Sequence, residues 1–336
     1  MRAHLSWLLL MACQEVPLVT SGTTVVEAPP EVDAVSPDLV VDEVVQATPE
    51  QIDVLWVVDD SGSMANEQTL LALEFPRFMQ LVLDSHADVH IGVVTTDASG
   101  AEGGALEQAA AFRWVTPDTP NPVGTFREMV EVGTGGSAFE TGRRAAWLAL
   151  SPPLTKTFNQ GFRRDAADLH IIFVSDEEDN SGQIPTQQAF LEFLAPDADG
   201  PLIQTHAITG LPPVPSCGIE PGSEYVALAD ATGGTSYSLC SEDWAPIIES
   251  LGLTASGLVR DVYLSQLPRP GTLRVEIEEA NGFVWDGVDD KGLDPCESVR
   301  CTPYVYDASS NGIRLTAWVP PEGATFRLTY EALGGS

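Results

Sequence analysis

Four apolar runs along the chain have the character of strands that are buried on both faces of a sheet. These runs occupy residues 52–58, 89–95, 169–174 and 203–208. Stretches with helical character lie between and after them, at residues 67–84, 139–150, 186–194 and 244–254. Because buried strands alternate with helices, residues 51–256 are predicted to form an α/β domain. Its sheet is expected to be Rossmann-like, open and mostly parallel, with helices on both faces.

The hydrophobic pattern changes after about residue 257, where apolar and polar positions alternate with a period of two. The apolar sets are Leu273, Val275 and Ile277, then Ile313, Leu315, Ala317 and Val319, then Phe326, Leu328 and Tyr330. A period of two, with Gly and Pro between the runs, is typical of antiparallel strands with one buried face. Residues 257–336 are therefore predicted to form a small antiparallel β domain.

The first residues have the pattern of an export signal. Arg2 precedes an apolar run at residues 5–12, which is too short to span a bilayer, and Cys13 follows at once. The tetrad Leu10-Met11-Ala12-Cys13 resembles the lipobox of bacterial lipoproteins. The resemblance implies that residues 1–12 are a signal peptide and that Cys13 receives lipid. The protein is then expected on a membrane of the bacterial cell envelope, at the outer membrane or the cell surface. A chance cysteine after an ordinary cleavable signal is the alternative.

The segment that follows is acidic and contains many prolines. Residues 14–50 include eight acidic side chains and five prolines but no Lys or Arg. Such a composition buries little apolar surface and extends by self-repulsion. Residues 13–50 are therefore predicted to be a tether between the membrane and the folded body.

The acidity extends to the whole chain. Its 336 residues include 49 Asp and Glu against 16 Lys and Arg, which gives a formal net charge of −33. A surface this acidic repels phosphate groups, so nucleic acid is not expected as a partner. The charge can attract divalent cations and basic ligands. Solubility, or adaptation to a salty medium, explains the excess equally well.

Four cysteines remain when Cys13 is set aside. They are Cys217, Cys240, Cys296 and Cys301, and an even number in an exported chain indicates two disulfides. Sequence neighbours are the natural pairs, which gives Cys217 with Cys240, although three connectivities are possible. A zinc site is the competing interpretation, but the spacings do not form paired C-x2-C knuckles.

The most informative polar motif is Asp59-x-Ser61-x-Ser63, which follows the first buried strand and precedes a helix. In open α/β sheets, ligands bind outside the carboxyl ends of the strands. One carboxylate and two hydroxyls at alternate positions can face one point there. All three are hard oxygen donors, which suit Mg²⁺, Mn²⁺ or Ca²⁺ rather than zinc or copper.

Two further loops have a similar place in the pattern. Residues 175–179 end another buried strand with four acids in five positions, an arrangement that is costly unless the acids are solvated or bound to a cation. Residues 133–137 form a Gly-rich loop that leads into the helix carrying Glu140 and Thr141. Its glycines permit tight backbone geometry.

In order and spacing, these three loops over residues 51–256 resemble the metal-ion-dependent adhesion site of von Willebrand factor type A domains. In that family the two serines bind the metal directly, the third loop provides a Thr oxygen, and the two aspartates act largely through water. An acidic group of a ligand completes the shell of the metal. The resemblance implies Mg²⁺, or Mn²⁺ or Ca²⁺ in its place, bound by Asp59, Ser61, Ser63, Ser137 and Asp176.

Ser137 departs from the Thr that is usual in the family. Thr134, Glu140 or Thr141 can take its place. The identity of the third-loop donor therefore stays open at this point.

The function implied by the resemblance is binding, without catalysis, of a protein that offers a carboxylate. A structural or assembly component of the envelope with a silent metal site is the alternative. Hydrolysis is disfavoured, because the Asp60-Ser61-Gly62 sequence has no second D-S-G or D-T-G partner and G-x-S-x-G is absent. His170 and His206 fall within predicted core strands without an activated partner pattern, so we expect them to pack there.

Overall fold

The computed structural model of the chain describes residues 38–100, 103–137, 139–195, 200–288, 304–316 and 318–333. Residues 38–336 cluster as one compact unit. Within the described ranges, no helix has the length and apolar character needed to cross a membrane. The predicted lipidation site Cys13 and the cysteines Cys296 and Cys301 lie outside the described residues.

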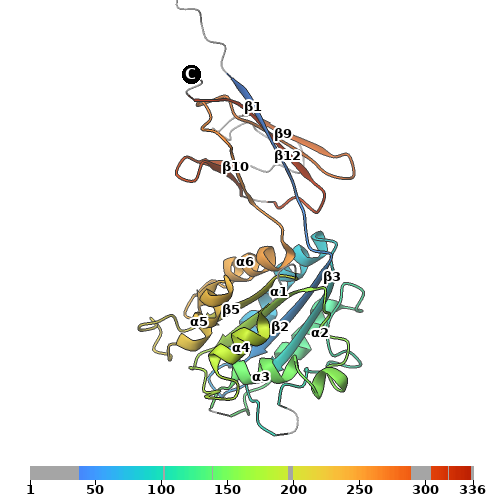
Figure 1. The fold of residues 1–336 in the computed structure, drawn as a ribbon, viewed down its shortest axis with the longest axis vertical. Helices are drawn as coiled ribbons and strands as arrows, with labels where there is room; N and C mark the ends of the chain where they lie inside the picture. Colours follow the sequence, from blue (N-terminus) through green and yellow to red (C-terminus); the bar gives the residue numbers. More distant parts are fainter. Residues whose placement is uncertain are drawn as a thin grey trace, which may run out of the picture. The chain divides into compact units, whose positions relative to one another are not determined.

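A five-stranded parallel sheet forms the centre of the α/β part (Figure 1). Its strands, in the order in which they pair, are β3 (Asp88–Thr95), β2 (Gln51–Val58), β4 (Asp168–Ser175), β5 (Ile203–Thr209) and β6 (Ser236–Ser238). Each neighbouring pair runs parallel. The predicted α/β class and the four apolar strands are therefore confirmed. The short polar strand β6 was not predicted, because three half-buried residues carry no periodic signal.

Helices cover both faces of the sheet, as predicted. The helices are α1 (Ala65–Asp84), α2 (Pro122–Val130), α3 (Gly142–Ala149), α4 (Gln187–Leu194), α5 (Ser223–Thr232) and α6 (Ala245–Ser256), with a short 3₁₀ turn at Leu154–Lys156. Strand β2 shows how the two layers are built. Trp56 and Val58 share a core with α1, α2 and α6, whereas Leu55 and Val57 share the other core with α3, α4 and α5.

Two antiparallel sheets form the remaining part. One has the order β1 (Leu39–Val45), β12 (Thr325–Glu331), β8 (Arg274–Glu278) and β9 (Val284–Val288). The other has the order β10 (Tyr304–Asp307), β11 (Gly312–Leu315) and β7 (Asp261–Tyr263). Both contribute to one hydrophobic core, in which Val275, Phe326 and Ile313 are buried. The predicted antiparallel β unit is confirmed.

The prediction that the whole of residues 13–50 is a tether was wrong. Strand β1 lies inside that range and pairs antiparallel with β12, from Leu39 opposite Glu331 to Val45 opposite Thr325. Val40 and Val44 pack against the core of the β unit. Two of the acids that suggested self-repulsion lie in β1 and have partners: Asp42 accepts hydrogen bonds from the Tyr330 hydroxyl (2.8 Å) and from Ser265, and Glu43 pairs with Arg327. The β unit thus combines β1, which precedes the α/β domain in the chain, with strands that follow that domain.

Two histidines lie side by side within the parallel sheet. Nδ1 of His170 on β4 is 3.2 Å from Nε2 of His206 on β5, and both residues are buried. The backbone N–H of Thr235 donates to Nδ1 of His206 (3.2 Å), so neutral His206 carries its proton on Nε2 and donates it to His170. Burial lowers the pKa of His206 to about 4. Burial, together with the neighbouring His206, lowers the pKa of His170 to about 3.

These pKa values predict acid lability. Below pH ~6.5 the unfolded chain protonates both rings while the folded chain does not, so stability falls as the pH drops from 6.5 toward 4. His206→Gln keeps an acceptor and a donor but cannot titrate. It is expected to reduce the slope of unfolding free energy against pH, between pH 5 and 6, by about 1 kcal/mol per pH unit. Urea denaturation over a pH series measures this.

The matched control is His86→Gln, because the side chain of His86 is 66% exposed. His86→Gln also removes one imidazole, and it is expected to change the slope less than His206→Gln does. A His206→Gln profile that runs parallel to that of the unchanged protein would refute the role assigned to the histidine pair.

Candidate metal centre

The carboxylate of Asp59 is fixed between the ends of two strands. Asp59 follows β2 directly and is fully buried, and its N–H donates to the carbonyl of Val174 in β4 (3.0 Å). One carboxylate oxygen accepts from the backbone N–H of Ser61 (2.7 Å), and the other accepts from the hydroxyl of Ser175 (2.6 Å). The side chain therefore lies at the carboxyl edge of the sheet in a single orientation.

The next predicted donors are linked to Asp59 through the backbone N–H of Ser61, and to one another through their own oxygens. The hydroxyls of Ser61 and Ser63 lie 3.1 Å apart, and Ser63 donates to the Asp176 carboxylate (3.2 Å). Ser61 is buried, whereas Ser63 is exposed. Four of the five predicted donors, Asp59, Ser61, Ser63 and Asp176, thus come together at an edge that solvent can reach.

Ser137 does not join them. Its hydroxyl accepts a local hydrogen bond from the N–H of Phe139 (3.0 Å), and among the described residues it shares no hydrogen bond with the other four predicted donors. The loop itself is close, because the N–H of Gly136 donates to the carbonyl of Asp60 (2.8 Å). A Cβ added at Gly136 would meet the carboxylate of Asp60, so a larger residue here would require the Asp60 side chain to move.

Gln68, on helix α1, holds the first and third loops together and was missed from the sequence. Its amide nitrogen donates to the carbonyls of Asp59 (2.9 Å) and Gly133 (2.8 Å), and its amide oxygen accepts from the N–H of Gly133 (3.3 Å). Gln68 is buried. A Gln near the start of a helix has no particular chemical meaning by itself, so no pattern in the sequence indicated this role.

Among the alternatives to Ser137, Glu140 has the most distinctive surroundings. Glu140 is fully buried, and the Thr96 hydroxyl donates to one of its carboxylate oxygens, while the other has no hydrogen-bond partner. The hydroxyl of Thr141 instead donates to a backbone group, the carbonyl of Thr96 (2.9 Å). Burial raises the pKa of Glu140 to about 8, and Asp59, Glu177 and Asp60 add to the effect through charge repulsion.

The acidic loop after β4 is divided between two tasks. Glu178 accepts from the N–H groups of Ser223 and Glu224 (both 2.9 Å), the first two residues of α5. Asp179 accepts from the N–H of Arg143 (3.1 Å), the second residue of α3. Carboxylates are stabilised at helix N-termini, so these two acids cap helices. Asp176 and Glu177 are left facing the candidate centre.

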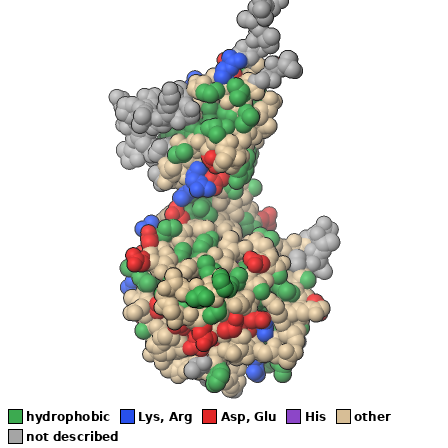
Figure 2. Space-filling model, turned by 90° about the vertical axis from the view of Figure 1, so that its left-hand side faces the viewer, with side chains coloured by type: hydrophobic (Ala, Val, Ile, Leu, Met, Phe, Trp, Pro, Cys, Tyr) green, Lys and Arg blue, Asp and Glu red, His purple; other side chains and the backbone are tan. Residues whose placement is uncertain are grey.

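The acids at this edge repel one another. Burial raises the pKa of Asp60 to about 6, with contributions from the charges of Asp97 and Asp59. Burial and the charge of Asp59 also raise the pKa values of Asp176 and Glu177. Figure 2 shows a band of acidic side chains on the visible face of the α/β part. Such a concentration of negative charge is relieved by a cation.

The predicted donors fit a hard divalent cation, because they combine carboxylates with hydroxyls. Beside them, one carboxylate oxygen each of Asp60 and Glu140 is buried without a hydrogen-bond partner. No group of three or more His, Cys, Asp or Glu side chains within the described ranges is arranged to hold a metal ion. A cation would therefore depend on the serine hydroxyls as well as on the carboxylates.

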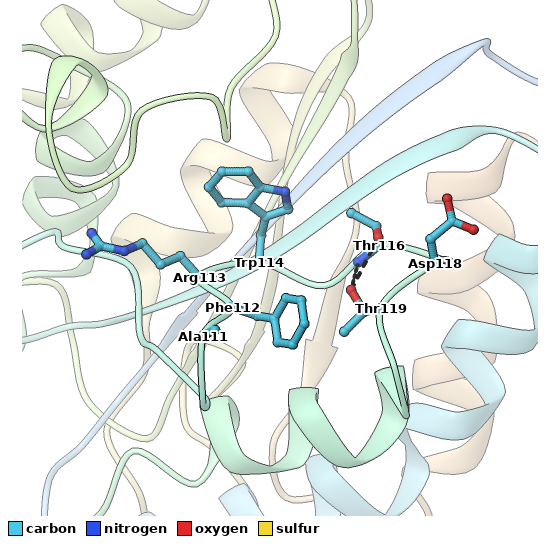
Figure 3. Close-up of a pocket in the computed structure, with 7 residues that line it drawn as sticks. All are labelled: Ala111, Phe112, Arg113, Trp114, Thr116, Asp118 and Thr119. Carbon is cyan, nitrogen blue, oxygen red and sulfur yellow. Dashed lines mark hydrogen bonds between the residues drawn. The ribbon is translucent and has the colours of Figure 1, made fainter.

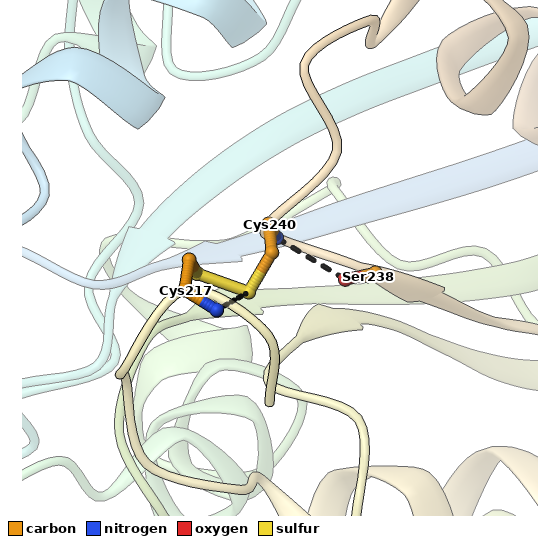
Figure 4. Close-up of a disulfide and its surroundings, with 3 residues drawn as sticks. All are labelled: Cys217, Ser238 and Cys240. Carbon is orange, nitrogen blue, oxygen red and sulfur yellow. Dashed lines mark hydrogen bonds between the residues drawn. A yellow bond between two sulfur atoms is a disulfide. The ribbon is translucent and has the colours of Figure 1, made fainter. Parts of the chain in front are cut away.

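The predicted disulfide between Cys217 and Cys240 is present, with Cα atoms 5.5 Å apart (Figure 4). It ties the loop after β5 to the turn after β6 and closes a loop with a sequence separation of 23 residues, which contributes about 3 kcal/mol in the chain-entropy model. The tied loop reaches the candidate centre, because the N–H of Glu220 donates to the carbonyl of Asp176 (3.1 Å). The disulfide thus restrains a loop that borders the candidate centre.

A separate pocket of about 440 Å³ lies on a different segment (Figure 3). Phe112 and Trp114 line it together with Thr116, Asp118 and Thr119. None of the predicted donors contributes to its lining. The pocket therefore has no part in the candidate centre.

No known family model matches the chain, and no curated protein sequence matches it. Among solved structures, the chain is similar to the pilus adhesin RrgA from Streptococcus pneumoniae, with a TM-score of 0.34 and 10% sequence identity. The match covers 88% of this chain and 59% of the adhesin chain. Similarity at this level does not establish a shared fold family.

The division of the acidic loop predicts opposite effects from two neighbouring carboxylates. Glu178→Ala removes the acceptor for the first two N–H groups of α5 and is expected to lower the unfolding free energy by about 1 kcal/mol. Asp176→Asn keeps an acceptor for Ser63 and relieves repulsion, so it is expected to leave stability unchanged or higher. Urea denaturation at pH 7 compares them. A larger loss in Asp176→Asn than in Glu178→Ala would contradict this division.

Proposed function

We propose that residues 51–256 form a module of the von Willebrand factor type A kind, in which Asp59, Ser61, Ser63 and Asp176 hold a divalent cation. The observation that carries the proposal is a set of four oxygen-bearing side chains at the carboxyl edge of a parallel sheet. The Asp59 carboxylate accepts from the backbone N–H of Ser61, the hydroxyls of Ser61 and Ser63 are in contact, and Ser63 donates to Asp176. Ligands of open α/β sheets bind at this edge. The uncompensated acids around it supply the attraction for a cation.

The proposed activity is metal-dependent binding of a protein, without chemical conversion. A bound divalent cation would supply a coordination position for an oxygen atom of the partner. Asp59 orients the first loop, because its carboxylate is held by Ser175 and the N–H of Ser61. Ser63 and Asp176 present their oxygens at the solvent side. Gln68 keeps the third loop next to the first.

We further propose that the protein is displayed on the bacterial cell envelope by lipid on Cys13. The tetrad Leu10-Met11-Ala12-Cys13 supports this. Since β1 (Leu39–Val45) belongs to the folded β unit, the tether that we propose ends before that strand. A partner is then bound at a distance from the membrane that the tether length sets.

The test of the metal site is calorimetric titration with Mg²⁺. Saturable binding is expected in the unchanged protein, and Asp59→Asn is expected to weaken it about tenfold or more. Asparagine is chosen because truncation would leave the buried Ser175 hydroxyl and the N–H of Ser61 without an acceptor. Circular dichroism checks that each variant is folded.

The control is Asp165→Asn, which makes the same change of charge at an exposed residue near the opposite, amino edge of the sheet. Its affinity for Mg²⁺ is expected to be unchanged. Saturable binding of equal strength in Asp59→Asn would disprove the site. A flat titration of the unchanged protein would favour the structural role with a silent centre.

The proposed anchor is tested by mass spectrometry of the mature protein. We expect Cys13 at the mature N-terminus, with a mass increase that corresponds to thioether-linked diacylglycerol. Cys13→Ser is expected to move the protein from the membrane fraction to the soluble fraction. An unmodified N-terminus beyond residue 13 would show that the tetrad does not direct lipidation.

A further inference from the structure

Glu140 is a buried carboxylate that the fold leaves half satisfied. Its side chain is 0% exposed, the Thr96 hydroxyl donates to one oxygen, and the other oxygen has no partner. The nearby Arg143 forms ion pairs with other acids, Asp179 (3.4 Å) and Glu224 (2.7 Å). Among the described residues, Glu140 has no ion pair. A buried carboxylate is costly without a counter-charge, so such groups pair with a cation or stay protonated until one binds.

The position of Glu140 places it beside the candidate centre. Thr96, which donates to Glu140, follows β3, and its own N–H donates to the carbonyl of Val58 (3.1 Å). Val58 is the last residue of β2 and immediately precedes Asp59. The carbonyl of Glu140 also accepts from the N–H of Asn180 in the acidic loop (2.6 Å). Glu140 is thus held between the loops that carry Asp59 and Asp176.

We propose that Glu140, rather than Ser137, is the donor from the third loop, an inference that rests on the proposed metal-binding function. Ser137 is occupied by the N–H of Phe139, whereas one oxygen of Glu140 is free of hydrogen bonds. Because Asp59, Glu140 and Asp176 are not already gathered as a group of three, at least one of them acts through water or after a change of rotamer.

A third carboxylate changes which cation and which partner the site favours. Ca²⁺ takes six to eight oxygen ligands and accepts several carboxylates in flexible geometry, whereas Mg²⁺ usually retains waters and one or two carboxylates. Asp59, Glu140 and Asp176 together favour Ca²⁺. Three negative charges around a dication also cancel the residual positive charge that would attract a carboxylate. The oxygen that the partner contributes is then a neutral carbonyl or hydroxyl.

The experiment compares Glu140→Gln with Ser137→Ala by calorimetric titration with Ca²⁺ and with Mg²⁺. Glutamine keeps the size of the side chain and an acceptor for Thr96. Glu140→Gln is expected to weaken Ca²⁺ binding about tenfold or more and to reduce the preference for Ca²⁺ over Mg²⁺. Ser137→Ala is expected to bind both cations as the unchanged protein does.

Thermal unfolding without and with Ca²⁺ separates metal binding from a structural role. Without Ca²⁺, Glu140→Gln is expected to be at least as stable as the unchanged protein, because glutamine is neutral and keeps an acceptor for Thr96. With Ca²⁺, it is expected to gain less in melting temperature. Lower stability without Ca²⁺, combined with unchanged Ca²⁺ affinity, would assign Glu140 a structural role and overturn the inference.

The outcomes distinguish this inference from the proposed function. If the unchanged protein binds neither cation, both fail. If it binds a cation, and Ser137→Ala weakens the binding while Glu140→Gln does not, the metal site stands and the assignment of Glu140 is wrong.

Discussion

The buried carboxylate of Asp59 is the interaction on which the candidate centre depends. Asp59 directly follows β2. Its carboxylate accepts from Ser175 at the end of β4 and from the N–H of Ser61, in the turn that leads to α1. The positions of Ser61 and Ser63 follow from that turn, and Ser63 then meets Asp176. The Asp59 side chain therefore contacts the ends of two neighbouring strands and fixes the turn that spaces the donor oxygens.

The fold neutralises part of the negative charge at this edge without a metal. Helices α5 and α3 begin beside the acidic loop, and their free N–H groups bind Glu178 and Asp179. Arg143 adds a positive charge to Asp179. The carboxylates of Asp176 and Glu140 receive only hydroxyl donors in the described residues, from Ser63 and Thr96 respectively. The carboxylates that are paired with neither a basic side chain nor a helix N-terminus are thus concentrated where the oxygen donors meet.

Strand β1 shows where composition misleads. Residues 14–50 contain no Lys or Arg, and local self-repulsion predicts an extended tether. Its partners come from the other end of the chain: Tyr330 donates to Asp42, and Arg327 pairs with Glu43 (2.8 Å). The alternation of Val40 and Val44 with exposed neighbours was the available signal. Seven residues of alternation are weak when the matching strand lies almost 300 residues away.

The sequence alone determined the layered architecture and the place of the centre. Runs such as 52–58 are apolar on both faces, which only a covered parallel sheet satisfies, and polar loops at their ends must then meet at one edge. Tertiary structure decided which side chains face that edge. Ser137 and Glu140 differ by three positions in one loop, yet the first turns to its own backbone and the second is buried beside Thr96. The same holds for Gln68, whose role exists only because two distant loops both place a carbonyl next to it. Loop conformation depends on contacts from several strands and helices at once, and no local pattern of residues encodes those contacts.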